Sequence, residues 1–118
     1  HSAWLMSSLV MGCKGLLSGA GSVIADLQVE LWRAVQDQDL MRAKDVNDRI
    51  YPLVQAFYAP PFLDMHNRMK EAAVLLGRIP NAVVRPPLCK LDTSEISRIE
   101  AALKAAKIGT EFSVPRAA

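Results

Sequence analysis

Apolar residues recur at intervals of three and four along most of this chain, which is the spacing of amphipathic helices. A short helix is expected over residues 2–10, and its apolar side would be formed by Trp4, Leu5, Leu9 and Val10. Four longer stripes follow: Ile24, Leu27, Leu31 and Val35; Ala43, Val46, Ile50, Val54 and Phe57; Phe62, Met65, Met69, Ala72 and Leu76; and Ile96, Ile99, Leu103 and Ala106. The pattern predicts a mostly helical chain.

Small residues and prolines mark the expected helix ends. Gly12, Gly77 and Gly109 are placed to end helices, because glycine adopts the left-handed backbone of a helix C-terminus at no steric cost. Ser22 is placed to cap the start of the second helix, since its hydroxyl is suited to accept from a free amide. Pro60–Pro61 ends the third helix.

The second half of the chain carries further punctuation. Pro52 lies inside the 43–57 stripe and lacks an amide donor, so a kink or a local break is expected there. Residues 78–92 are proline-rich and predict an extended connector. Asp92 and, three positions later, Glu95 resemble a capping box for the last helix. Residues 110–118 have no periodic pattern and predict a loosely held tail.

Residues 14–18 break the helical pattern. They form a short apolar run framed by Gly15 and Gly19, and glycines would cost a helix stability. The run therefore predicts a strand that leads through a turn into a helix. One strand cannot form a sheet, because its backbone groups need partners. Either the partners come from a segment upstream of this sequence, or the run is absorbed into a helical hairpin.

Composition narrows the class of protein. Half of the 118 residues are hydrophobic (51%), 22% are charged, and the net charge is only +2, with basic residues dispersed among acids. This argues against disorder and against a nucleic-acid partner. Charged residues interrupt every apolar run, so no membrane span is expected. Cys13 and Cys89 lack metal-ligand or redox spacing, which favours free thiols in a reducing compartment, the cytoplasm.

A series of short motifs follows in a specific order: Gly12-x-x-Gly15-Leu16-Leu17-Ser18-Gly19, Tyr51-Pro52-Leu53, Met69-Lys70-Glu71-Ala72, Val84-Arg85-Pro86-Pro87-Leu88 and Ala101-Ala102-Leu103-Lys104. In this order and separation, the chain resembles the dihydrodipicolinate synthase and N-acetylneuraminate lyase family over roughly residues 3–109. Family members are class I aldolases, lyases and dehydratases that bind pyruvate or another 2-oxo acid as a Schiff base on a barrel lysine.

The resemblance implies an α/β fold, in which this chain is the C-terminal piece of a TIM (β/α)8 barrel. Residues 1–38 would supply the seventh helix, the eighth strand at 14–18 and the eighth helix. Residues 39–109 would form a C-terminal three-helix region, and 110–118 the tail. The catalytic lysine would lie upstream, so this segment alone is expected to be inactive. The parent would need no cofactor, would contact the remainder of the barrel, and would assemble as a homotetramer.

The subfamily is less clearly marked than the family. Many members carry Ser-Gly-x-x-Asn-x-x-Pro, whereas this chain has Ser22 and Ala25 at the last two marked positions. The segment 59–64 also departs from the Asn-Pro pattern of the dihydrodipicolinate synthases. These departures favour a less characterised aldolase or lyase.

The resemblance places Leu17, Ser18 and Gly19 at the substrate pocket as binding residues and assigns no catalytic residue to this chain. For Leu17 the alternative is an ordinary barrel-core leucine. The helix start around Ser22 offers amides to an anion, although a simple N-cap is favoured. Lys14 precedes the strand and is expected to be solvated, whereas a Schiff-base lysine must be desolvated or otherwise lowered in pKa.

Other chemically suggestive residues favour structural roles. Lys70 is expected on a helix surface, and Asp64 and His66 do not face each other because they lie two apart on a helix. No metal site is expected. Arg85 is interpreted as a tether of its loop to the barrel, with an exposed arginine as the alternative. The competing hypothesis for the whole chain is an independent helical interaction module without catalysis.

Overall fold

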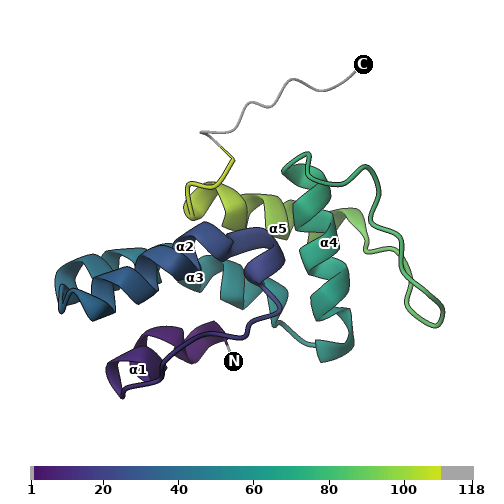
Figure 1. Cartoon of the computed structure of the whole chain (residues 1–118). Coiled ribbons are helices and arrows are strands. Elements are labelled where there is room, and N and C mark those ends of the chain that lie inside the picture. Colours follow the sequence, from purple (N-terminus) through teal and green to yellow (C-terminus); the bar gives the residue numbers. More distant parts are fainter. Residues whose placement is uncertain (1, 110–118) are drawn as a thin grey trace.

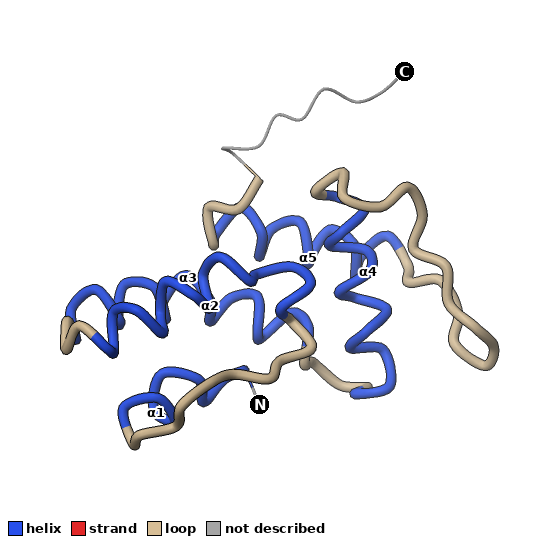
Figure 2. The backbone as a smooth tube through the Cα atoms, in the orientation of Figure 1, coloured by secondary structure: helices blue, strands red, loops and turns tan. Residues whose placement is uncertain are grey.

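The computed structural model describes residues 2–109, and over this range it consists of helices joined by loops, with no strand (Figures 1 and 2). The mostly helical character expected from the pattern is confirmed. The elements are the 3-10 turn η1 (Ser2–Trp4), α1 (Leu5–Val10), α2 (Gly21–Gln36), α3 (Leu40–Phe57), the 3-10 turn η2 (Phe62–Asp64), α4 (Met65–Leu75) and α5 (Thr93–Ala105).

The helices α2 and α3 form a hairpin, and the other elements are arranged around it. In Figure 1, α1 lies along one side of this pair, and α4 stands steeply beside its end. The helix α5 packs against both α3 and α4. The core between them is formed by side chains that are almost completely buried, including Ile24, Leu31, Ile50, Leu53, Phe57 and Ile99.

The predicted stripes account for most of this core. All five apolar residues of the α3 stripe are buried. Of the four apolar residues expected on one side of residues 2–10, Leu5 and Leu9 in α1 are buried, whereas Trp4 in η1 and Val10 are exposed. Phe62 also is exposed, since it lies in η2 before α4 begins.

Four helices, α1, α2, α4 and α5, end with a left-handed residue and the same pair of hydrogen bonds. After α4, the Gly77 amide donates to Val74 O and the next amide donates to Ala73 O. Gly12 plays the same part after α1, as predicted. After α2 and α5 the left-handed residues are not glycine but Gln38 (φ 58°) and Lys107 (φ 55°). The last helix thus ends before Gly109, which was expected to end it.

The expectation about Ser22 was wrong. Ser22 is not an N-cap: α2 begins at Gly21 after Ala20, and the Ser22 hydroxyl donates to Gly19 O at 3.3 Å. Of the two alternatives expected at Pro52, a local break is excluded, since α3 is one helix from Leu40 to Phe57, and a kink stays a prediction. The helix that departs from regular geometry is α2, at Ile24 (φ −122°, ψ 28°).

The predicted connector and cap are observed. Residues 78–92 contain no helix, and α4 holds them through the Lys70 Nζ bond to Val83 O (2.6 Å) and the Asn67 Nδ2 bond to Cys89 O (2.7 Å). Asp92 accepts from the Glu95 amide at 2.8 Å. This bond, and then the Ser94 hydroxyl, lower the pKa of Asp92 from its ordinary value. A full capping box would also require the Glu95 carboxylate to accept from the Asp92 amide, and this second bond is not observed.

Residues 14–18 do not form the expected strand; they are drawn as a loop in Figure 2. A strand exists only where a second strand accepts its backbone hydrogen bonds, and residues 2–109 supply none. The expected tail at 110–118 lies outside the described residues.

A buried arginine joins the second half of the fold. Arg68 on α4 is 1% exposed. Its Nε donates to Glu95 Oε2 on α5 at 2.9 Å. Its terminal nitrogens donate to a row of carbonyls at the end of α3 and in the following turn, namely Phe57 O (3.3 Å), Ala59 O (2.6 Å), Pro60 O (3.3 Å) and Pro61 O (3.2 Å). One guanidinium therefore fixes α3, α4 and α5 to one another.

The substitution Arg68→Met should lower the free energy of unfolding by about 3–5 kcal/mol, because it leaves buried carbonyls and a carboxylate without their donor. Chemical denaturation monitored by circular dichroism measures this change. Arg98→Ala is the matched control: it removes the other, half-exposed partner of Glu95 and should cost less than about 1 kcal/mol. Equal effects of both substitutions would contradict the assigned role of Arg68.

The substitution Gln38→Gly should raise the free energy of unfolding by about 0.5–1 kcal/mol, because glycine tolerates the left-handed backbone at this exposed position. Gly77→Ala is the reciprocal control. It should lower the free energy by about 1 kcal/mol from backbone strain alone, since a Cβ there meets no atom within 4 Å. Thermal unfolding of both variants tests this, and a destabilised Gln38→Gly protein would contradict it.

Candidate substrate-contacting loop

The three residues predicted to contact substrate lie together on the loop between α1 and α2. Leu17 is fully exposed, Ser18 is half-buried, and Gly19 is exposed immediately before α2. A leucine in open solvent is not a core residue of the described chain. Its side chain is available to another part of a larger protein or to a ligand.

The hydroxyl of Ser18 is held by a chain of hydroxyl groups. Ser18 Oγ lies 2.9 Å from Ser2 Oγ, which in turn lies 3.0 Å from the Tyr58 hydroxyl. Ser2 is 3% exposed and lies in η1, while Tyr58 is the residue that ends α3. Sequence reasoning missed this contact, because the three residues are separated by 16 and 56 positions.

Gly19 lies near α4, although it is exposed. A Cβ at Gly19 would lie 3.5 Å from His66 Cε1 and 3.8 Å from the Met69 thioether. The start of α2 also engages its own amides: Gly21 donates to Ser18 O, and Val23 and Ile24 donate to Ala20 O. These three amides are therefore already bonded within the chain.

Lys14, Lys70 and Asp64 lie where their predicted structural roles place them. Lys14 is exposed. Lys70 bonds a connector carbonyl. Asp64 accepts from Asn67 Nδ2 (3.4 Å), and no bond joins it to His66. Arg85 is exposed and makes no side-chain hydrogen bond or ion pair with another described residue, so its tether to a barrel stays a prediction.

Within residues 2–109, no group of three or more His, Cys, Asp or Glu side chains is arranged to hold a metal ion. Cys13 and Cys89 are both free and exposed, as expected from their spacing. No helix in the same range is long and apolar enough to cross a membrane.

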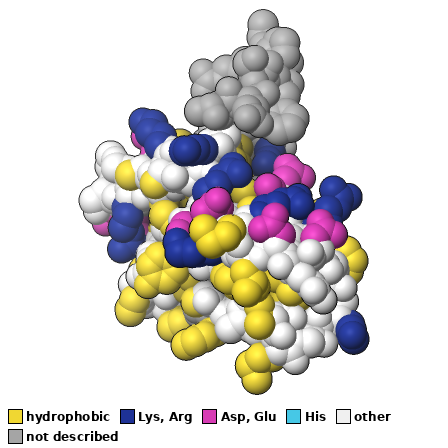
Figure 3. Space-filling model, turned by 90° about the vertical axis from the view of Figure 1, so that its left-hand side faces the viewer, with side chains coloured by type: hydrophobic (Ala, Val, Ile, Leu, Met, Phe, Trp, Pro, Cys, Tyr) yellow, Lys and Arg dark blue, Asp and Glu magenta, His cyan; other side chains and the backbone are white. Residues whose placement is uncertain are grey.

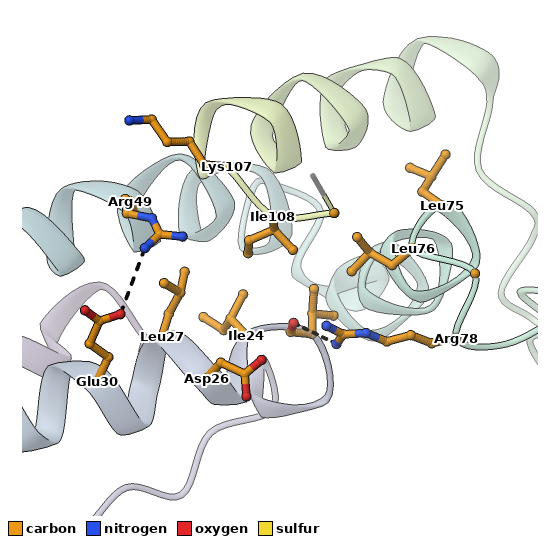
Figure 4. Close-up of a pocket in the computed structure, with 13 residues that line it drawn as sticks. Ile24, Asp26, Leu27, Glu30, Arg49, Leu75, Leu76, Arg78, Lys107 and Ile108 are labelled. Carbon is orange, nitrogen blue, oxygen red and sulfur yellow. Dashed lines mark hydrogen bonds and ion pairs between the residues drawn. The ribbon is translucent and has the colours of Figure 1, made fainter. Parts of the chain in front are cut away.

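A separate cavity of about 590 Å³ lies between α2, α3 and the ends of α4 and α5 (Figure 4). Its apolar lining includes Ile24, Leu76 and Ile108. Its arginines already have partners: Arg49 bonds Ala106 O and lies 3.9 Å from Glu30, and Arg78 bonds the carbonyls of Ser22 and Val23. None of Leu17, Ser18 and Gly19 lines it.

The sequence of this chain is similar to parts of several known enzymes. A putative 2-dehydro-3-deoxy-D-gluconate aldolase of Escherichia coli (strain K12) is 29% identical over 105 residues, which are 88% of this chain and 34% of the relative. The 4-hydroxy-tetrahydrodipicolinate synthases of Laribacter hongkongensis and Mesorhizobium japonicum are 33% and 32% identical over 90% and 79% of this chain, and 35% and 30% of their own lengths.

The chain thus spans about a third of the length of these curated relatives. The model of the dihydrodipicolinate synthetase family matches residues 2–106, which is nearly all of the described chain. The relatives are named as synthase and aldolase enzymes, in agreement with the lyase parent expected from the motifs. The chain therefore belongs to the dihydrodipicolinate synthetase family.

Proposed function

We propose that this chain works as the C-terminal segment of a Schiff-base-forming aldolase or lyase that acts on pyruvate or a related 2-oxo acid. The observation that carries the proposal is the family match over residues 2–106. In this function the nucleophilic lysine comes from a segment that this sequence does not contain. The chain supplies the last barrel strand, one wall of the pocket through Leu17, Ser18 and Gly19, and the helical region behind it.

Exposed apolar side chains near the loop between α1 and α2 support the proposal that another protein segment covers this surface. Trp4, Met11 and Leu17 are large apolar side chains that are well exposed. Figure 3 shows hydrophobic side chains gathered on the lower part of the face on which α1 lies, with most of the charged side chains above them. An apolar surface of this kind is typical of a region that packs against other protein. In the proposed function, the missing barrel strands and helices cover it, and residues 14–18 pair with a neighbouring strand.

The positions of Lys14 and Lys70 support the proposal that the nucleophilic lysine lies outside this chain. A lysine that forms a Schiff base at neutral pH must be desolvated or placed beside other cations, so that its amine loses the proton. Lys14 is exposed on the loop, and the Lys70 ammonium is exposed and donates to Val83 O. Neither side chain is removed from solvent in the way that a Schiff-base lysine requires.

A chimera tests the activity. Residues 2–109 replace the matching third of the Escherichia coli relative, and the protein is treated with pyruvate and sodium borohydride. Hydride reduces a Schiff base to a stable amine, so mass spectrometry should find the chimera labelled and the 118-residue chain unlabelled. The intact relative is the positive control. A folded but unlabelled chimera would overturn the proposal and favour the independent helical module. Labelling of Lys14 or Lys70 in the isolated chain would overturn the assignment of the nucleophile to an upstream lysine.

The substitution Leu17→Asn tests the covered surface. In the 118-residue chain it should change the free energy of unfolding by less than about 0.5 kcal/mol, because the side chain is in solvent. In the chimera it should cost more, up to about 1.5–3 kcal/mol, the value for complete burial of a leucine, because the barrel covers the part of the side chain that does not face the pocket. Thermal unfolding of the two pairs of proteins measures the difference. Equally small effects in both would contradict burial of Leu17 by the barrel.

A further inference from the structure

The hydroxyl chain of Ser18, Ser2 and Tyr58 connects the proposed substrate loop to the helical region. The middle member, Ser2, is buried, and its single oxygen contacts both neighbours, at 2.9 Å and 3.0 Å. A buried serine hydroxyl with two such contacts has a defined orientation, because turning it away breaks both bonds. Ser18 is therefore held in place from inside the protein.

The far end of this chain is itself fixed. Tyr58 lies between Phe57 and Ala59, whose carbonyls both accept from the buried Arg68 guanidinium. Arg68 is anchored in turn to Glu95 on α5. A continuous series of hydrogen bonds and short backbone links thus runs from α5 through α4 and the end of α3 to the loop that carries Ser18.

The direction of donation along the three hydroxyl groups decides whether Ser18 can donate a hydrogen bond to a ligand. Each hydroxyl has one hydrogen to donate. Either oxygen of each contact can be the donor. In one of the two directions Tyr58 donates to Ser2 and Ser2 donates to Ser18, and the hydrogen of Ser18 is then left for an acceptor other than Ser2. In a pocket for a 2-oxo acid, the available acceptors are the carboxylate and carbonyl oxygens of the bound molecule.

We propose that Ser2 and Tyr58 are positioning residues that orient the Ser18 hydroxyl as a donor to an oxygen of the bound 2-oxo acid. This inference rests on the proposed function and goes beyond it, because it gives the helical region a part in substrate binding. Ser18 touches the substrate, whereas Ser2 and Tyr58 act only through Ser18.

Steady-state kinetics of the chimera that has not been treated with borohydride test the inference, with 2-dehydro-3-deoxy-D-gluconate as substrate. Ser18→Ala, Ser2→Ala and Tyr58→Phe should each raise KM about twofold to tenfold, the value of one hydrogen bond, with a smaller change in kcat. Tyr58→Phe added to Ser18→Ala should raise KM no further, because its effect passes through the lost hydroxyl. Tyr51→Phe, at an exposed tyrosine of α3, is the matched control and should leave KM unchanged.

The outcomes separate this inference from the proposed function. If pyruvate labels the chimera but KM is unchanged in Tyr58→Phe, or the two substitutions act independently, the positioning role is wrong and the proposed function stands. If no labelling occurs, the proposed function fails and the substrate contact of Ser18 fails with it. NMR of the 118-residue chain tests the hydroxyl chain itself: Tyr58→Phe should shift the Ser18 resonances and Tyr51→Phe should not, and an unshifted Ser18 overturns the inference.

Discussion

The described fold depends on the burial of one charge, the guanidinium of Arg68. Removing an arginine from water is costly, and the cost is offset only if nearly every donor finds an acceptor. Here the acceptors come from the end of α3, from the turn that follows it and from α5. Each must keep its place for the charge to stay satisfied. The geometry of three helices is therefore set by a polar group as well as by apolar packing.

This constraint reaches the candidate site. Tyr58 is flanked by two of the carbonyls that Arg68 holds, and its hydroxyl bonds the buried Ser2, which bonds Ser18. The loop therefore has two different sides. Ser18 is anchored to the interior, while Leu17 projects into solvent. In the proposed function, both residues belong to one wall of the substrate pocket.

The helices and the family could be predicted from the sequence. The helices follow from the spacing of apolar residues a few positions apart, and the family follows from the order of short motifs. The α3 stripe repeats over 15 residues, and every member is buried. Arg68 was not singled out, although it lies between Asn67 and Met69 on the apolar side of α4. Its partner Glu95 is 27 positions away, and no periodicity reports that separation. Arg85, by contrast, is conspicuous in the sequence because it precedes two prolines, yet it is exposed.

By itself, the sequence determined which segments become helices, since side-chain periodicity acts over a few residues, and which family the chain belongs to, since motif order survives substitution. Tertiary structure alone decided the state of residues 14–18, the buried role of Arg68 and the bonds of Ser18. Each of these depends on groups brought together from distant positions. A strand needs a neighbouring strand, a buried charge needs several acceptors, and a hydroxyl chain needs three separate segments, and folding alone supplies or withholds such partners.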